Sequence, residues 1–264
     1  MQVALFCGDR FGTYKVLQQI IDKKVEVVAC VFEENDCLLR DMCIERGIPC
    51  YNAEQMYELV RLKKFPHFDL GISYLYHKIL KKEIIEYGNG NIINFHPAPT
   101  EVHRGVAACC YCLMKGYKEW AVTAHFITPG IDDGDIIAQR RFSLSNVETG
   151  QEAEALIQRE SAVLFDQVLS MFLSGEPIPR YTQKTFAGEY YSRASLEEDK
   201  KIHFNETTDS IVKKIHSLWM PPYHGAYIEL NGKKYSLVDD VILNKIFQER
   251  QEMINCRHFK EEER

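Results

Sequence analysis

Short apolar runs alternate with amphipathic stretches along most of this chain. The apolar runs are rich in residues that favour strands and cover residues 3–7, 25–32, 69–75, 91–95 and 122–128. The helical spacing of apolar positions predicts helices near residues 13–23, 36–46, 53–62, 80–87 and 105–116. Such an alternation is typical of βαβ units, in which helices pack against a mostly parallel sheet. The pattern therefore predicts an α/β fold.

The last third of the chain has a different pattern. A long amphipathic helix is expected over residues 152–174, and the sequence SGEPIPR ends it with a glycine and two prolines. A polar stretch follows, then a short helix near residues 207–218 and a β-hairpin over residues 226–238, whose Asn-Gly pair favours a tight turn. We therefore expect a main domain over residues 1–180 and a C-terminal extension over residues 181–264.

The composition narrows the range of partners. The chain has 264 residues, of which 45% are hydrophobic and 27% are charged, as in ordinary globular proteins. Its formal net charge is −6, whereas a general nucleic-acid-binding protein needs a basic surface that displaces counterions from phosphates. We therefore expect no nucleic-acid partner.

The N-terminal sequence and the cysteines indicate a cytoplasmic protein without a membrane partner. MQVALFCGDR lacks the basic and apolar regions of a signal peptide, and no apolar run approaches the roughly 18 residues of a bilayer span. Nine cysteines without a secretory signal favour reduced thiols. Cys109, Cys110 and Cys112 could be redox or metal ligands, but no second cysteine pair partners them, and their helical context favours buried core thiols.

The sequence NFHPAPTEVHRG, residues 94–105, follows a run that is expected to be a buried strand. Asn94 and His96 are two positions apart, so their side chains point to the same side of the strand end. Pro97 and Pro99 end the strand and stiffen the segment that leaves it. In open α/β sheets ligands bind beyond the carboxyl ends of the strands, which makes this segment a candidate site.

A second candidate segment is ITPGIDDGDII, residues 127–137, in which two glycines bracket Asp132 and Asp133 just after a strand. An amide, an imidazole and a carboxylate at one sheet edge suit acyl-type chemistry, with a donor to the oxyanion, a proton acceptor and an orienting group. Asparagine and aspartate also cap ordinary turns, and the spacing alone leaves both interpretations open.

Taken together, the order Asn94-x-His96-Pro97, Arg104-Gly105 and GIDDGDII resembles the formyltetrahydrofolate-dependent formyltransferases. That family includes the glycinamide ribonucleotide, methionyl-tRNA and nucleotide-sugar enzymes. The resemblance covers residues 1–180 and implies a Rossmann-like formyltransferase domain. It also implies that Asn94, His96 and Asp132 form the catalytic trio. The chain departs from the family where HPSLLP is often found, because it has HPAPTEVHRG there.

The resemblance implies N10-formyltetrahydrofolate as the cosubstrate, with no metal. An amine adds to the formyl carbon, Asn94 and a protonated His96 stabilise the resulting oxyanion, and Asp132 binds the imidazole or receives the amine proton through water. The segment SYLYHKIL, residues 73–80, matches the folate-contacting loop of the family. The expected folate contacts are Tyr76, His77, Lys78, Ile79, Thr128 and Gly130.

The acceptor-binding residues are less sharply defined by the sequence. Gly8 and Arg10 lie in a turn where backbone N–H groups and a guanidinium could meet a phosphate, although an ordinary βα turn fits equally well. His103 and Arg104 are candidates for lining the substrate cleft, and Arg104 could instead be a solvated charge at the start of the next helix. His125 could face the site or be a core histidine.

The C-terminal third bears on the acceptor. Residues 202–235 resemble the segment that joins the two domains of methionyl-tRNA formyltransferases, and only a short stretch follows them here. A main domain with a helix-and-hairpin extension is most similar to the nucleotide-sugar N-formyltransferases of bacterial surface polysaccharide (O-antigen, lipopolysaccharide) synthesis. This predicts a homodimer acting on a nucleotide-linked amino-dideoxy sugar. The alternatives are a methionyl-tRNA formyltransferase-like enzyme and a non-catalytic folate- or sugar-nucleotide-binding module. The identity of the nucleotide base, the identity of the sugar and the carbon that bears the amine stay open.

Overall fold

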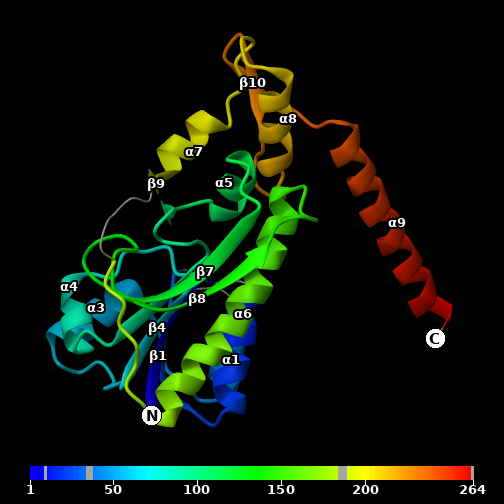
Figure 1. Ribbon diagram of the computed structural model, residues 1–264. Coiled ribbons are helices and arrows are strands. Elements are labelled where there is room, and N and C mark those ends of the chain that lie inside the picture. The colour runs from blue at the N-terminus through cyan, green and yellow to red at the C-terminus, as the bar shows by residue number, and fades with distance from the viewer. Residues whose placement is uncertain (9–10, 34–37, 184–188, 263–264) are drawn as a thin grey trace. The chain divides into compact units, whose positions relative to one another are not determined.

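The apolar runs of the N-terminal half come together in one mostly parallel sheet (Figure 1). The structure, a computed structural model, describes residues 1–8, 11–33, 38–183 and 189–262, and it leaves out the side chains of residue 11, residue 38 and residues 252–262. Within these residues the sheet has seven strands in the order β3-β2-β1-β4-β5-β7-β8. They are β1 (Gln2–Cys7), β2 (Glu26–Phe32), β3 (Cys50–Asn52), β4 (Leu70–Tyr74), β5 (Ile92–His96), β7 (Glu119–Phe126) and β8 (Ile136–Ser143).

The chain divides into two compact units. Unit 1 comprises residues 1–108, 119–143 and 156–190, and unit 2 comprises residues 109–118, 144–155 and 191–264. Unit 1 therefore contains the whole sheet. The domain boundary at residues 180/181 that the sequence predicts stays a prediction.

Helices cover both faces of the sheet in unit 1. On one face, α1 (Phe11–Asp22) lies beside α6 (Gly150–Ser174), where Lys23, just beyond α1, forms an ion pair with Asp166 at 2.9 Å (Figure 1). The ring of Phe165 on α6 packs 5.2 Å from that of Phe95 on β5. On the other face, α3 (Ala53–Arg61) and α4 (Lys82–Tyr87) bury Met56 and Ile84 against β1 and β2. Apolar burial on both faces explains why these strands are continuous hydrophobic runs.

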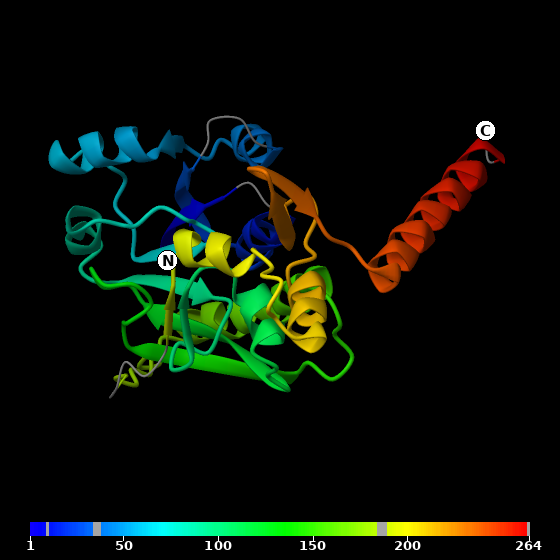
Figure 2. The same cartoon turned by 90° about the horizontal axis from the view of Figure 1, so that it is seen from above.

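The sheet changes from parallel to antiparallel strand pairing at β5. Strands β3, β2, β1, β4 and β5 run parallel, while β7 pairs antiparallel with β5 and with β8. The β7–β8 pair runs side by side in both views (Figures 1 and 2). The order in which the chain adds strands to the sheet reverses between the parallel neighbours β1 and β4. Such a switch point opens a crevice beyond the carboxyl ends of the strands. Gly8 follows β1 there, and a Cβ at this position would lie 2.6 Å from the carbonyl oxygen of Leu75, directly after β4.

Unit 2 contains several short elements and one long helix. They are the greater part of α5 (Ala108–Met114), α7 (Arg193–Asp199), α8 (Thr208–Ser217), the hairpin β10 (Tyr227–Leu230) with β11 (Lys233–Ser236), and α9 (Asp240–Glu262). The hairpin turns at Asn231 and Gly232, whose φ angles of 51° and 74° are those of the left-handed region that this residue pair favours. Lys245 on α9 pairs with Glu152 at 2.6 Å. Two small strands, β6 (His103–Gly105) and β9 (Glu189–Tyr191), pair with each other.

The predicted fold class is confirmed: the chain is α/β with a mostly parallel, Rossmann-like sheet and a C-terminal helix and hairpin. The sequence missed β3 and β8, because β3 has only three residues and β8 carries several half-exposed polar side chains. The helix predicted over residues 105–116 is shorter, α5 beginning at Ala108. Gly105 and Ala107 adopt φ angles of 92° and 61°, which a right-handed helix does not allow.

Candidate active site

Two neighbouring antiparallel strands place the first three polar side chains of the site. Asn94 and His96 lie at the carboxyl end of β5, and the register sets Asn94 opposite His125 on β7. Opposed residues on one face of a sheet bring their side chains together. The side-chain nitrogen of Asn94 is 3.3 Å from Nε2 of His125.

The turn after β7 brings a carboxylate to the same place. Asp132 has a φ of 51°, a left-handed conformation that aspartate tolerates better than most residues. The N–H of Gly105 donates to its Oδ2 at 2.9 Å. The Gln183 amide donates to the carbonyl of Gly134 at 2.7 Å and to that of Asp132 at 3.3 Å. The turn is therefore held from two sides of unit 1.

These side chains converge on Asp132. Its Oδ2 lies 3.4 Å from Nδ1 of His96, and its Oδ1 lies 3.5 Å from Nε2 of His125. Only 12% of the Asp132 side chain is exposed, against 4% for His96 and 3% for His125. The structure thus gathers the three residues that the sequence singles out, Asn94, His96 and Asp132, and adds His125. We call these four residues the strand-end cluster.

The electrostatics of the strand-end cluster favour an ionised carboxylate. Burial alone would raise the pKa of Asp132, but the His96 and His125 rings and the Gly105 N–H outweigh it and lower this pKa well below its usual range. Asp132 is therefore a carboxylate at neutral pH.

His96 has acceptors at both ends of its ring. Nε2 donates to the carbonyl oxygen of His103 at 3.1 Å, and Nδ1 faces Asp132. Burial lowers the pKa of His96 and so does His125, while Asp132 and the His103 carbonyl act in the opposite direction. The net direction is downward. The protonated His96 expected from the sequence is therefore not the resting form, because the buried ring has lost the water that would solvate its charge.

Asn94 is oriented by a residue of the neighbouring strand. Ser73 on β4 donates its hydroxyl to Oδ1 of Asn94 at 3.0 Å. Because that oxygen is occupied, the amide turns its NH2 group towards His125. One N–H of this group then remains for a ligand oxygen.

His103 lies behind His96 and is 1% exposed. The two rings are nearly parallel, with an angle of 21° and centroids 6.1 Å apart, and Nε2 of His103 donates to the carbonyl oxygen of Val106 at 3.1 Å. Burial and the nearby His96 lower the pKa of His103 to about 4. The expectation that His103 lines a substrate cleft is therefore corrected: its buried ring supports His96.

The other two expected substrate contacts can be placed only in part. Arg104 lies half-buried on β6, four residues before α5 begins, and so it is not a solvated charge at a helix start. Arg10 lies outside the described residues. Gly8 stands at the switch point of the sheet, as the sequence-based hypothesis requires.

The expected folate loop directly follows β4. Tyr76 is half-buried, with its ring 6.2 Å from that of Phe6, whereas His77, Lys78 and Ile79 are exposed. Glu33, just after β2, fixes the loop by accepting hydrogen bonds from the backbone N–H of His77 and, through its carbonyl, from Nζ of Lys78 at 2.9 Å. The loop thus has a fixed backbone and exposed side chains, which suits ligand contact.

Thr128 and Gly130 belong to a closed network within the turn. The Thr128 hydroxyl donates to Asp133 and accepts from the N–H of Gly130 at 3.2 Å. A Cβ at Gly130 would lie 1.8 Å from a carboxylate oxygen of Asp133. Asp133 therefore shapes the turn, while its neighbour Asp132 faces the histidines. Folate contact by Thr128 and Gly130 stays a prediction.

Residues 11–169, more than half of the chain, match the formyl transferase family. The chain belongs to the formyltransferase family. It is 32% identical over 187 residues to a methionyl-tRNA formyltransferase of Syntrophomonas wolfei subsp. wolfei, and this match covers 70% of the chain but only 58% of that relative.

The fold of this formyltransferase family member is also that of solved sugar N-formyltransferases. One is the enzyme of Helicobacter canadensis in complex with folinic acid and dTDP-3-aminofucose, with a TM-score of 0.71, 22% identity, and coverage of 89% of this chain and 86% of that one. Another is a 4-N formyltransferase of Francisella tularensis, with a TM-score of 0.75, 18% identity, and coverage of 90% and 96%. At these identities the likeness concerns the fold.

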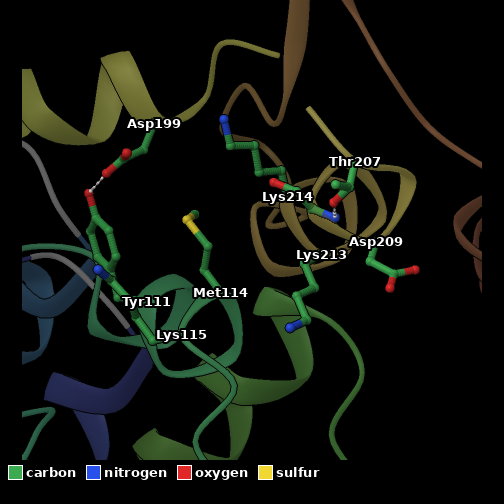
Figure 3. Close-up of a pocket in the computed structure, with 9 residues that line it drawn as sticks. Tyr111, Met114, Lys115, Asp199, Thr207, Asp209, Lys213 and Lys214 are labelled. Carbon is green, nitrogen blue, oxygen red and sulfur yellow. Dashed lines mark hydrogen bonds between the residues drawn. The ribbon is translucent and has the colours of Figure 1, made fainter. Parts of the chain in front are cut away.

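Unit 2 of this formyltransferase family member contains a separate polar pocket of about 400 Å³ (Figure 3). It lies between α5, α7 and α8, and we call it the α8 pocket; its lining residues are Tyr111, Met114, Lys115, Asp199, Thr207, Asp209, Ser210, Lys213 and Lys214. Tyr111 donates to Asp199 at 2.6 Å, as the dashed line in Figure 3 marks, and Lys214 pairs with Glu206 at 2.9 Å.

The sequence missed several residues that hold the site. Ser73, Glu33 and Gln183 each bind a site segment from a distant part of the chain, and the sequence around them does not indicate these hydrogen-bond partners. His125 was left open between site and core, and only the strand register decides for the site.

The described residues contain no group of three or more histidine, cysteine or acidic side chains placed to hold a metal ion. None of their helices combines the length and apolar character that a bilayer span requires.

Proposed function

We propose that this chain transfers a formyl group from N10-formyltetrahydrofolate to the amine of a nucleotide-linked amino-dideoxy sugar for bacterial surface polysaccharides. The observation that carries the chemistry is that His96 and His125 both face the Asp132 carboxylate, which is 12% exposed, while the Asn94 amide lies beside His125. Binding alone would need neither a buried proton acceptor nor an N–H donor fixed beside it.

In this proposal Asn94 stabilises the charge that develops on the formyl oxygen when the amine adds. Its Oδ1 is held by Ser73, so the N–H groups are oriented before the ligand arrives. A donor that needs no reorganisation in a site of low dielectric contributes more to catalysis than the same donor in water.

His96 and Asp132 manage the proton of the amine. The attacking amine must be neutral, and it gains a positive charge as its bond to carbon forms. His96 is neutral at rest but has an oxygen acceptor near each ring nitrogen, so it can take up a proton and be stabilised by Asp132 at 3.4 Å. Asp132 keeps its charge throughout because its pKa is lowered.

The folate cosubstrate supplies an activated formyl group, and the loop after β4 is where this chain would hold it. Tyr76 presents a half-buried ring, and Ile79 is 65% exposed, unusually high for a large aliphatic side chain beside an active site. The backbone of the loop is fixed by Glu33, which leaves its remaining polar groups free to face a ligand. An apolar platform with a fixed backbone edge suits the pterin ring.

Two observations favour a nucleotide sugar as the acceptor. The fold likeness to sugar N-formyltransferases includes most of unit 2, since it covers 89–90% of the chain. The Helicobacter canadensis enzyme binds a dTDP-linked amino sugar. A diphosphate also gives the acceptor an anchor at the carboxyl ends of β1 and β4, near Gly8, and correct positioning of the amine can contribute several kcal/mol to the rate.

Methionyl-tRNA is the second candidate acceptor. It is favoured by the 32% identity with the Syntrophomonas wolfei enzyme, which exceeds the identity with the solved sugar enzymes. Against it stands the net charge of −6, which disfavours a polyphosphate partner. The proposal accordingly has no nucleic-acid partner. It also includes a cytoplasmic location.

A competition assay separates these candidates. The full chain is incubated with formyltetrahydrofolate and, in turn, dTDP-linked 3-amino and 4-amino deoxy sugars, the free amino sugars and methionyl-tRNA. We expect formylation of a nucleotide-linked sugar and little of the free sugar or the tRNA. Preference for methionyl-tRNA, or equal rates on free and nucleotide-linked sugars, would contradict the acceptor assignment. Folate binding without transfer to any acceptor would favour a non-catalytic module.

We also propose that unit 2 forms a homodimer, partly through residues 215–240. An isolated two-stranded hairpin is marginal in water, yet Leu230 and Tyr235 on the hairpin are 42% and 48% exposed. Replacing both with glutamate should shift the sedimentation coefficient from dimer to monomer at micromolar concentration. The matched variant Lys233→Glu with Lys234→Glu should not. A wild-type chain that sediments as a monomer would contradict the proposed homodimer.

A further inference from the structure

Three thiols meet at one edge of the sheet in unit 1, away from the strand-end cluster. Cys30 on β2 and Cys50 on the edge strand β3 are direct neighbours in the parallel register. Cys43 projects from α2 (Leu38–Glu45), and its Sγ lies 3.5 Å from that of Cys30. A disulfide needs sulfurs about 2.0 Å apart, so a small side-chain movement would join this pair.

The surroundings of Cys43 favour its thiolate. The hydrogen-bonded contact with Cys30 lowers the pKa of Cys43, and Cys50 and the Arg46 guanidinium act in the same direction, while burial opposes them. Cys30 is the complementary member, since its pKa is raised by the contact with Cys43 and by burial. One sulfur of the pair is therefore suited to attack an oxidant, and the other remains a thiol.

A second cluster of thiols, on α5, lacks these features. Cys109, Cys110 and Cys112 lie buried on α5, and burial raises the pKa of Cys112 to about 12. Cys109 and Cys110 are adjacent on a helix, where consecutive Cα atoms are about 3.8 Å apart, closer than the usual disulfide range of 4.4–6.8 Å. These thiols are expected to stay reduced under the same conditions.

A small oxidant can approach the Cys30–Cys43 pair from the sheet edge. Cys30 and Cys43 are buried, but Cys50 beside them is only partly covered, because β3 is the last strand of the sheet. Hydrogen peroxide is little larger than water and carries no charge. These properties favour its passage past the partly covered Cys50 to the two sulfurs.

We propose that Cys30 and Cys43 are a redox modification site that a peroxide converts to an intramolecular disulfide. The Cys43 thiolate attacks one peroxide oxygen, and the other leaves as hydroxide, which gives a sulfenic acid at Cys43. The Cys30 sulfur then attacks the Cys43 sulfur. The S–S bond forms, the S–O bond breaks, and the Cys30 proton leaves with the oxygen as water. Two thiols are oxidised and one peroxide is reduced to two waters.

Peptide mapping of the full chain tests the assignment. Trypsin separates the three thiols, because Cys30 lies in residues 25–40, Cys43 in residues 41–46 and Cys50 in residues 47–61. The first peptide also contains Cys37, so every arm carries Cys37→Ser. After brief hydrogen peroxide treatment, alkylation in denaturant and digestion, we expect a linked peptide joining residues 25–40 to residues 41–46. Dithiothreitol should release it, and two thiols per chain should be lost.

The variants make the result specific. Cys30→Ser and Cys43→Ser should each abolish the linked peptide, while Cys112→Ser should leave its yield unchanged. The linked peptide in the Cys37→Ser chain decides the matter even where a further variant folds poorly. A link from residues 41–46 to residues 47–61 in place of the expected one would overturn the pairing. Faster alkylation or oxidation on α5, or no thiol loss before methionine oxidation begins, would overturn the proposal.

Discussion

The strand-end cluster and the α8 pocket both gather polar and charged side chains, but they arrange them differently. In the strand-end cluster the two imidazoles face a single carboxylate, and Asp132 is 12% exposed. In the α8 pocket polar side chains form separate pairs: Tyr111 donates to Asp199 (Figure 3), and Lys214 pairs with Glu206. The difference teaches that convergence on one shared group, more than the number of charged groups, makes a site suited to proton transfer.

The physical reason is the dielectric environment. Two charges 4 Å apart interact by about 1 kcal/mol in water and several times more at a partly buried site. Removing the shared carboxylate of the strand-end cluster should therefore affect every member, whereas removing one pair of the α8 pocket should affect that pair alone. Four experiments test this contrast.

The largest effect is expected at Asp132. Asp132→Asn keeps the shape and can still accept the Gly105 N–H, but it removes the charge that stabilises a protonated His96. We expect kcat to fall by roughly 10³-fold with folate binding retained, within the range for loss of acid–base groups. Steady-state kinetics and fluorescence titration with folinic acid measure the two effects.

The neighbouring carboxylate is the matched control. Asp133 is bound by Thr128 within the turn, and Asp133→Asn preserves an acceptor for that hydroxyl. Its kcat should stay within about tenfold of wild type, because it loses no partner among the histidines. Equal losses in the two variants would mean that the turn as a whole, and not the converging carboxylate, is what matters.

The second effect is a pH-dependent loss of stability from His103. Its folded pKa of about 4 lies below the unfolded value of about 6.5. The unfolded chain thus binds a proton that the buried ring does not, and stability falls as pH drops from about 6.5 towards 4 and levels off above 6.5. His103→Gln should reduce the difference in unfolding free energy between pH 7 and pH 4.5 by about 2–3 kcal/mol.

Urea denaturation at the two pH values measures this difference. His67→Gln, at an exposed histidine, is the matched control variant. An unchanged pH dependence in His103→Gln would show that burial of this ring does not suppress its charge, and it would weaken the contrast with the α8 pocket.

The third effect concerns the orientation of Asn94. Ser73→Ala removes the hydroxyl that holds Oδ1 of Asn94, and we expect kcat to fall about tenfold, in line with roughly 1 kcal/mol for one hydrogen bond. Thr100→Val is the control in the loop after β5, since the buried Thr100 hydroxyl has no hydrogen-bond partner among the described residues. It should keep full activity. Similar rates for both variants would contradict a positioning role for Ser73.

The smallest effect is expected in the α8 pocket. Tyr111→Phe removes the hydrogen bond to Asp199 and should lower the unfolding free energy by about 1 kcal/mol with kcat unchanged. Tyr235→Phe, at an exposed ring, should change neither quantity. A loss of activity in Tyr111→Phe would break the comparison, because it would give the α8 pocket a part in the reaction.

The sequence by itself determined the fold class and singled out three of the four residues that the structure brings together in the strand-end cluster. The apolar runs predicted β1, β2, β4, β5 and β7, because strands buried on both faces require continuous apolar sequence. The two-residue spacing of Asn94 and His96 placed them on one face of β5, and the glycines around Asp132 marked a tight turn after β7. These are local properties, which a local pattern can encode.

Only the tertiary structure decided which groups meet. Only the packing of the chain decided that Ser73, His125 and Gln183 hold the site, because their partners are 21, 31 and 49 residues away. The neutral resting form of His96 and the supporting position of His103 were also decided there. Both depend on how much water the packed sheet, loop and turn exclude from the rings, and burial of that kind is a property of the whole fold.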